Sequence, residues 1–170
     1  TTTVVHQGVV YEGTIDGEEN YLVALDAATG EELWRFESES GGGFYSAATD
    51  GQTVYTGSDD DNFYALDAAT GAELWRFETS EDIRSAAALV DDTLYVAVFD
   101  GYLYAIDASN GAERWRFEIA GEVLYGPVVS GGVAYLGTTF GYFYAIGGSG
   151  EPATPGASPS VMVGAAPIAT

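Results

Sequence analysis

The densest group of side chains that could bind a ligand is an acidic run before the middle of the chain. Asp59, Asp60 and Asp61 are consecutive, and Asn62 follows them. Hard cations such as Ca²⁺ prefer oxygen ligands, so this run could supply part of a cation site. It lacks the ligand spacing of an EF-hand loop. We therefore interpret it as an acidic, solvated turn, and keep the three aspartates only as weak candidates for metal ligands.

Few other side chains have the chemistry of a catalytic or cofactor-binding group. The chain has no Cys and a single His, His6, so it offers neither a thiolate nucleophile nor a His/Cys ligand set. Arg84 is the one Arg outside the repeated motif described below, and it could bind an anion. A salt bridge from Arg84 to Glu81 or Asp82 is the favoured alternative. The sequence predicts no catalytic residue, no cofactor-binding residue and no cofactor.

The charge of the chain excludes several classes of partner. Its 170 residues include 26 Asp and Glu but only 5 Arg and no Lys, which gives a formal net charge of −21. Phosphate binding needs clustered basic side chains, so nucleic acid is excluded as a partner and an anionic membrane surface would repel the protein. No segment approaches the roughly 18 consecutive apolar residues of a membrane span. This acidic, Lys-free composition resembles that of haloarchaeal proteins, in which high salt screens self-repulsion.

The elements that carry these residues come from a unit of about 40 residues that occurs four times. Tyr11, Tyr55, Tyr95 and Tyr135 mark the unit at spacings of 44, 40 and 40. Each unit contains four short segments rich in β-branched and aromatic residues, separated by Asp- and Gly-containing turns, which predicts four strands. In the third unit we expect these strands at residues 84–90, 93–99, 102–107 and 113–119.

An 11-residue motif, Ala-x-Asp-x-x-Thr-Gly-x-x-x-Trp, anchors the first three units, with Asn110 replacing Thr in the third. The Gly supplies the positive φ of a tight hairpin and the Asp binds backbone N–H groups of the turn. The Ala leaves room for the indole. We expect the Arg after each Trp, and Arg114 before the third Trp, to pair with Glu side chains across the strands. All of these roles are structural. The motif residues are Ala24, Asp26, Gly30, Trp34, Ala65, Asp67, Gly71, Trp75, Ala105, Asp107, Gly111 and Trp115.

The motif resembles the tryptophan-docking motif of the pyrroloquinoline-quinone (PQQ)-type β-propellers, over about residues 1–147. That superfamily contains quinoprotein dehydrogenases, the outer-membrane assembly lipoprotein of the BAM complex and non-enzymatic repeat proteins. The resemblance implies an all-β propeller of four-stranded blades. We expect the four blades at residues 1–40, 41–80, 81–120 and 121–147.

The resemblance also implies that the first strand of each blade lines a central channel. Tyr45 and Tyr125 occupy equivalent positions in the first strands of blades 2 and 4. Arg84 aligns with Phe44 and Leu124 at the start of those strands. These five residues are the candidates for a channel mouth.

The last unit departs from the motif. Gly147 stands where the motif has Asp, and Pro155 stands where it has Trp. Residues 148–170 are rich in Gly, Pro, Ala and Ser, and Pro is unfavourable in a central strand. We therefore expect blade 4 to lack its fourth strand, and residues 148–170 to form a tail or linker.

An open arc of four blades would expose two blade faces, so the ends should be covered. We expect the chain to be half of a larger ring, completed by a second copy or by a longer natural chain; closure of the four blades on themselves is the alternative. The favoured function is a non-catalytic scaffold for protein interaction or assembly in a high-salt organism. The alternative is a fragment or subunit of a PQQ- and Ca²⁺-dependent dehydrogenase of alcohols or sugars. An extracellular or cell-surface location is favoured over the cytoplasm.

Overall fold

A computed structural model describes residues 3–15, 19–38, 40–123, 125–147 and, for the backbone, 160–163. Within these ranges every regular element is a β-strand. The strands form four antiparallel sheets of four strands, and each sheet keeps the order of the chain. In the part of the chain that the structure describes, no helix is long and apolar enough to cross a membrane.

Each sheet is one blade and contains four consecutive strands. Blade 1 holds β1 (Val4–His6), β2 (Val9–Gly13), β3 (Leu22–Asp26) and β4 (Glu32–Phe36). Blade 2 holds β5 (Phe44–Thr49), β6 (Thr53–Ser58), β7 (Asn62–Asp67) and β8 (Glu73–Glu78). Blade 3 holds β9 (Ala88–Val90), β10 (Thr93–Ala97), β11 (Tyr102–Asp107) and β12 (Glu113–Glu118). Blade 4 holds β13 (Val128–Ser130), β14 (Val133–Gly137), β15 (Phe143–Gly147) and β16 (Ser160–Val163).

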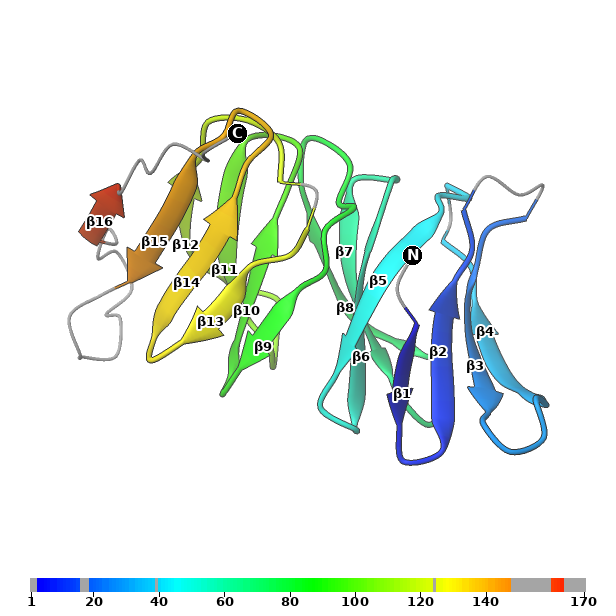
Figure 1. Cartoon of the computed structure of the whole chain (residues 1–170). Helices are drawn as coiled ribbons and strands as arrows, with labels where there is room; N and C mark the ends of the chain where they lie inside the picture. The colour runs from blue at the N-terminus through cyan, green and yellow to red at the C-terminus, as the bar shows by residue number, and fades with distance from the viewer. Residues whose placement is uncertain (1–2, 16–18, 39, 124, 148–159, 164–170) are drawn as a thin grey trace.

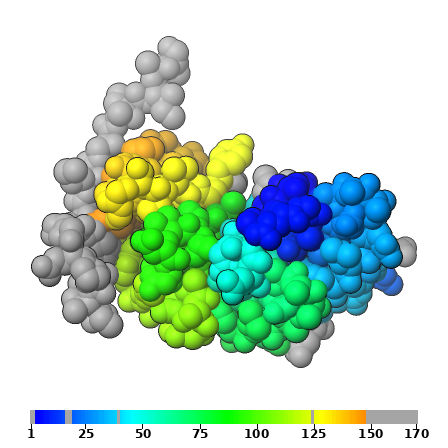
Figure 2. Space-filling model, turned by 90° about the horizontal axis from the view of Figure 1, so that it is seen from below, coloured from blue at the N-terminus to red at the C-terminus, as the bar shows by residue number. Residues whose placement is uncertain are grey.

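The blades stack face to face along an arc. Successive first strands, β1, β5, β9 and β13, contact one another along one side of the molecule (Figure 1). Seen from below, blade 1 in blue and blade 4 in yellow and orange lie at the two ends of the arc (Figure 2). The predicted all-β propeller architecture, with its blades of about 40 residues, is confirmed.

Three hydrophobic clusters fill the spaces between successive blades. The first joins blades 1 and 2, the second joins blades 2 and 3, and the third joins blades 3 and 4. Central strands are therefore buried on both faces, as the uninterrupted apolar segments of the sequence require. Leu103 and Tyr104, for example, are neighbours in β11 that point to opposite faces, and both are buried. The stability of each blade thus depends on its neighbours.

The motif turns have the predicted conformation. Gly30, Gly71 and Gly111 adopt φ values of 74°, 72° and 74°, a region in which residues with a β-carbon are strained. The Asp26 carboxylate accepts hydrogen bonds from the backbone N–H groups of Ala28 and Thr29 at 2.9 and 2.8 Å. The Gly and the Asp therefore stabilise the same tight hairpin between the third and fourth strands.

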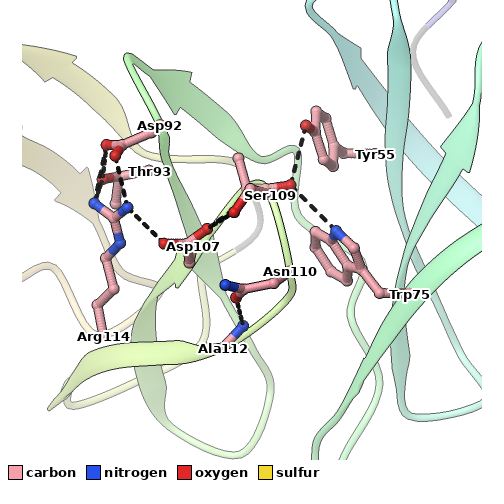
Figure 3. Close-up of polar contacts among 10 residues, drawn as sticks. Tyr55, Trp75, Asp92, Thr93, Asp107, Ser109, Asn110, Ala112 and Arg114 are labelled. Carbon is pink, nitrogen blue, oxygen red and sulfur yellow. Dashed lines mark hydrogen bonds and ion pairs between the residues drawn. The ribbon is translucent and has the colours of Figure 1, made fainter.

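The motif tryptophans join each blade to the next. The Trp34 indole packs against Gly71 of blade 2, and its N–H donates to the Ala68 carbonyl at 3.0 Å. Trp75 makes the same contact with the following blade, donating to the Ala108 carbonyl at 3.1 Å (Figure 3). Each of these indoles thus has the backbone acceptor that a buried N–H requires.

The motif arginines pair within their own strand, which corrects the expected cross-strand pairs. Arg35 lies 2.7 Å from Glu32, and Arg76 lies 2.8 Å from Glu73. Residues three apart normally lie on opposite faces of a strand. Here the register shifts at the motif Ala of the neighbouring strand, and this irregularity brings the two side chains to one side.

Blade 4 has a fourth strand, contrary to the expectation that this strand is missing. Backbone pairing joins β16 to β15, with Ala145 opposite Met162 and Ile146 opposite Val161. The sequence around Pro155 is indeed unlike a motif strand, but the chain supplies the strand from residues 160–163 instead. The unpaired N–H and C=O groups of β15 explain why a short segment with β-branched residues pairs there.

Candidate functional site

The predicted channel-mouth residues do not share one environment. Phe44 is a core residue with no exposed surface, which corrects its assignment to the channel mouth. Its backbone N–H donates to the Thr14 carbonyl of the preceding blade at 3.0 Å. In the next blade the equivalent bond comes from Ile83, which donates to the Ser58 carbonyl at 2.9 Å. The structural counterpart of Phe44 is therefore Ile83 and not Arg84.

This one-residue shift arises where the first strand begins. Ala48 lies four positions after Phe44, whereas Ala88 lies five positions after Ile83. Strand β5 continues back to Phe44 through a register shift, while β9 begins only at Ala88. An alignment counted back from the tyrosine anchors does not detect this difference.

Tyr45 and Arg84 are brought together by the shift. The Arg84 guanidinium lies 5.5 Å from the ring centroids of both Tyr45 and Phe99, a cation–π distance. Its Nε–H donates to Asp82 at 3.0 Å, and this hydrogen bond raises the pKa of Arg84. The Tyr45 hydroxyl donates to Asp59 at 3.3 Å, and burial raises the pKa of Tyr45.

The Arg84 cluster therefore favours a structural role over anion binding. The expected salt bridge to Asp82 is present. Tyr125, in contrast, is exposed on blade 4 and is not part of this cluster. Leu124 lies outside the described residues.

The acidic run is a hairpin turn whose carboxylates point to separate partners. Asp59 accepts a hydrogen bond from the Gly43 N–H, and Asp60 accepts one from the Tyr64 hydroxyl at 2.8 Å. Burial favours the neutral form of Asp60, but hydrogen bonds from Tyr64 and nearby serines outweigh it and lower its pKa. Burial and the surrounding carboxylates raise the pKa of Asp61. Among the described residues, no three His, Cys, Asp or Glu side chains are arranged to hold a metal ion.

One role of these aspartates was not identified from the sequence. Asp60 holds the ring of Tyr64 four positions later, and in the next blade Asp100 holds Tyr104 at 2.6 Å. The repeated Asp-x-x-x-Tyr spacing is the signal that could have indicated this lock. In blade 4 the equivalent position is Phe140, which is exposed. The carboxylates of Asp59, Asp60 and Asp100 already accept hydrogen bonds from this chain, so they are a poor fit to the ligand set of a Ca²⁺-bound quinone.

The side of blade 4 that faces away from blade 3 carries apolar residues at positions that are buried in the other blades. Tyr135 is 37% exposed, whereas its counterpart Tyr55 is 2% exposed. Phe143 is 48% exposed, whereas its counterpart Phe63 has no exposed surface. Residues 123–147 contain no charged side chain, although the chain as a whole is strongly acidic. We call this surface the blade-4 face, and it consists of Val128, Tyr135, Gly137, Phe143 and Ala145.

A groove of about 530 Å³ opens on the blade-4 face. Between internal blades the same place is filled: a β-carbon at Gly13 would overlap the backbone of Phe44, and one at Gly57 would overlap Ile83. At Gly137 a β-carbon would meet only the Tyr142 carbonyl, at 3.9 Å. The groove is therefore the space that a following blade would occupy. It is lined by Tyr125, Gly126, Val128, residues 135–139 and Phe143.

Comparison with known proteins places this blade architecture in a family. The model of the family described as outer membrane protein assembly factor BamB matches residues 18–97 and 85–151. The chain belongs to this family. Its repeats are thus PQQ-type propeller repeats, as the motif predicts. No curated protein matches the chain by sequence.

Solved structures share the fold of this BamB-family chain at low sequence identity. BamB from Moraxella catarrhalis is 24% identical, with a TM-score of 0.69 over 81% of this chain and 42% of its own. The computationally designed Ika4 protein is 17% identical, with a TM-score of 0.74 over 84% of this chain and 87% of its own. Quinohemoprotein alcohol dehydrogenase from Comamonas testosteroni is 18% identical, with a TM-score of 0.71 over 86% and 32%. The chain thus spans less than half of the BamB and dehydrogenase chains.

Proposed function

We propose that this BamB-family chain is a non-catalytic propeller arc that acts as a scaffold for protein interaction or assembly in a high-salt environment. The blade-4 face is the single observation that carries the proposal. It combines exposed aromatic side chains, an open groove and an uncharged stretch of 25 residues, 123–147, in a chain of net charge −21. Contiguous exposed apolar surfaces of this kind mark interaction sites.

The family description supports the same class of function, because it names an assembly factor. It also supports a location outside the cytoplasm, which we include in the proposal. The residues predicted to lie near a channel mouth add no competing site: Arg84 is paired with Asp82, and Phe44 is buried in the core. Protein binding therefore has a surface available in this molecule.

The alternative is a piece of a PQQ- and Ca²⁺-dependent dehydrogenase, and one experiment separates the two. The chain is incubated with PQQ and Ca²⁺ in molar salt, desalted, and examined for quinone absorbance. Oxidation of alcohols and sugars is then measured with an artificial electron acceptor. We expect no retained quinone and no oxidation above that of a PQQ and Ca²⁺ mixture without protein. Quinone that stays with the protein and supports oxidation would overturn the scaffold proposal.

A further inference from the structure

The proposed function does not name the protein that binds the blade-4 face. Blade 1, at the other end of the arc, indicates which protein this is. We propose that the blade-4 face binds blade 1 of a second copy of this chain, and that two copies close a ring through two identical contacts. The inference rests on the proposed scaffold function, since it names the partner of the same surface. The three contacts between successive blades of the chain support it.

The internal contacts define what fits on the blade-4 face. In blade 2, Ala48, Tyr55 and Ala65 are cross-strand neighbours on the side that faces blade 3. Blade 4 has the corresponding row Val128, Tyr135 and Ala145. The blade-4 row therefore has the same register as the blade-2 row and similar side chains. Blade 3 packs against the blade-2 row, whereas among the described residues no blade packs against the blade-4 row.

Blade 1 carries the complementary row at the other end of the arc. Val5, Val10 and Leu25 are cross-strand neighbours on the side opposite blade 2. In blade 3 the corresponding residues are Leu89, Leu94 and Ile106, which pack against blade 2. Leu94 and Ile106 are fully buried there, whereas Val5 is 63% exposed and Val10 and Leu25 are half-buried. We call Val5, Val10 and Leu25 the blade-1 face.

The distribution of charge permits this contact although both copies are strongly acidic. The described part of blade 4 that makes its face has no charged side chain, so it does not repel an approaching acidic chain. The three residues of the blade-1 face are aliphatic. Glu12 lies on the same side of β2 as Val10, at the position that Val96 holds in blade 3, and it accepts a hydrogen bond from the Thr3 hydroxyl of its own blade. Molar salt screens the remaining repulsion between the copies over distances above a few ångströms.

The area of the contact favours a closed pair over an open chain of copies. Four strands of five residues cover about 300 Å² on one face. A single contact would bury two such faces, about 600 Å², which is typical of weak crystal contacts. A closed pair buries four faces, about 1,200 Å², which reaches the range of stable interfaces. A head-to-tail contact that does not close would instead produce filaments.

The oligomeric state tests this inference. Sedimentation velocity of the full chain in molar salt should give a species of twice the chain mass. Phe143→Asp alters the blade-4 face and Val5→Asp alters the blade-1 face. Each places a carboxylate in the contact and should weaken the dimer about 100-fold or more, because the charge is left without a partner.

Leu74→Asp is the matched control. Leu74 is also an exposed apolar strand residue, at 54%, but it lies on β8, outside both faces. This variant should remain dimeric. All three variants change exposed residues, and far-UV circular dichroism with urea unfolding verifies that each is folded.

Three results would overturn the inference: a folded wild-type monomer at all concentrations, open-ended higher oligomers, or equal effects of Phe143→Asp and Leu74→Asp. A folded monomer would assign the blade-4 face to a different protein or to further blades of a longer natural chain. It would leave the scaffold proposal standing, because that proposal fails only if quinone is retained and supports oxidation.

Discussion

Asp107 shows how single residues stabilise the repeat. Its carboxylate accepts hydrogen bonds from the N–H and hydroxyl of Ser109 at 2.9 and 2.6 Å and from the Arg114 guanidinium at 2.8 Å (Figure 3). The hydrogen bond from the Ser109 hydroxyl, followed by that from Arg114, lowers the pKa of Asp107 to about 2. Arg114 also lies 2.8 Å from Asp92, so the turn is tied to a second hairpin of the same blade.

The lowered pKa predicts acid sensitivity. Because the pKa in the folded protein lies below the ordinary value of 3.8, the ionised Asp107 stabilises the fold fully above about pH 4. This stabilisation is lost as the pH falls through about 2. Asp107→Asn keeps an oxygen for Ser109 but loses the charge, and should lower the free energy of unfolding at pH 7 by about 1 kcal/mol.

Urea unfolding between pH 7 and pH 2 measures this effect. Asp107→Asn should show a smaller decrease in stability between pH 4 and pH 2 than the wild type does. Asp107→Ala, which removes both oxygens, should be the less stable variant at neutral pH. An unchanged acid dependence in Asp107→Asn would contradict the assigned role.

At the scale of the elements, the turn glycine is also a contact surface between blades. Gly30 and Gly71 have nearly the same φ, 74° and 72°, and each lies two residues before the fourth strand of its blade. A β-carbon at Gly71 would lie 2.7 Å from the Trp34 ring, whereas one at Gly30 would have no neighbour within 4 Å. Gly30 is therefore required only for its positive φ. Gly71 is required for its positive φ and also for the space that the Trp34 indole occupies.

This pair gives a matched prediction. Gly30→Ala should destabilise the protein by about 1 kcal/mol, because only the positive φ is strained. Gly71→Ala should cost a further 1–3 kcal/mol, roughly, because the methyl group displaces the Trp34 indole. The midpoints of urea unfolding in molar salt measure the difference. Equal midpoints for the two variants would mean that the indole does not pack on this turn.

At the scale of the whole molecule, the charge is distributed unevenly. All charged side chains except Glu151 lie within residues 1–122, while residues 123–147 carry none. Self-repulsion of the acidic part opposes the compact state, and salt screens it. The arc thus combines an acidic surface with one uncharged end, which is the end that we propose as the contact surface.

This distribution predicts salt-dependent stability. The midpoint of thermal unfolding should rise as NaCl is increased from about 0.1 M to molar concentration, because the Debye length falls from about 10 Å to about 3 Å. Replacing the exposed Glu31 and Glu37 by Gln should reduce the dependence on salt. A midpoint that does not change with salt would contradict the high-salt interpretation.

The sequence by itself determined the local and repeated features of this protein. The hairpin turns, the four-stranded unit and the motif contacts depend on residues that lie within about 40 positions of one another. Asp26 and Gly30, for example, form a turn that the residue types specify without reference to other blades. Because the motif recurs in the first three units and the tyrosine anchors recur in all four, the spacing predicted the blades and the propeller class.

Only the tertiary structure decided where the units meet and end. The alignment of Phe44 with Arg84 was wrong because backbone irregularities at the strand entries shift the register by one residue. The strand at 160–163 was missed because its pairing depends on the open edge of β15 and not on its own motif. The exposure of Tyr135 and Phe143 likewise depends on the absence of a packed neighbour among the described residues. These features arise from contacts between distant segments, which the residue pattern of one unit does not contain.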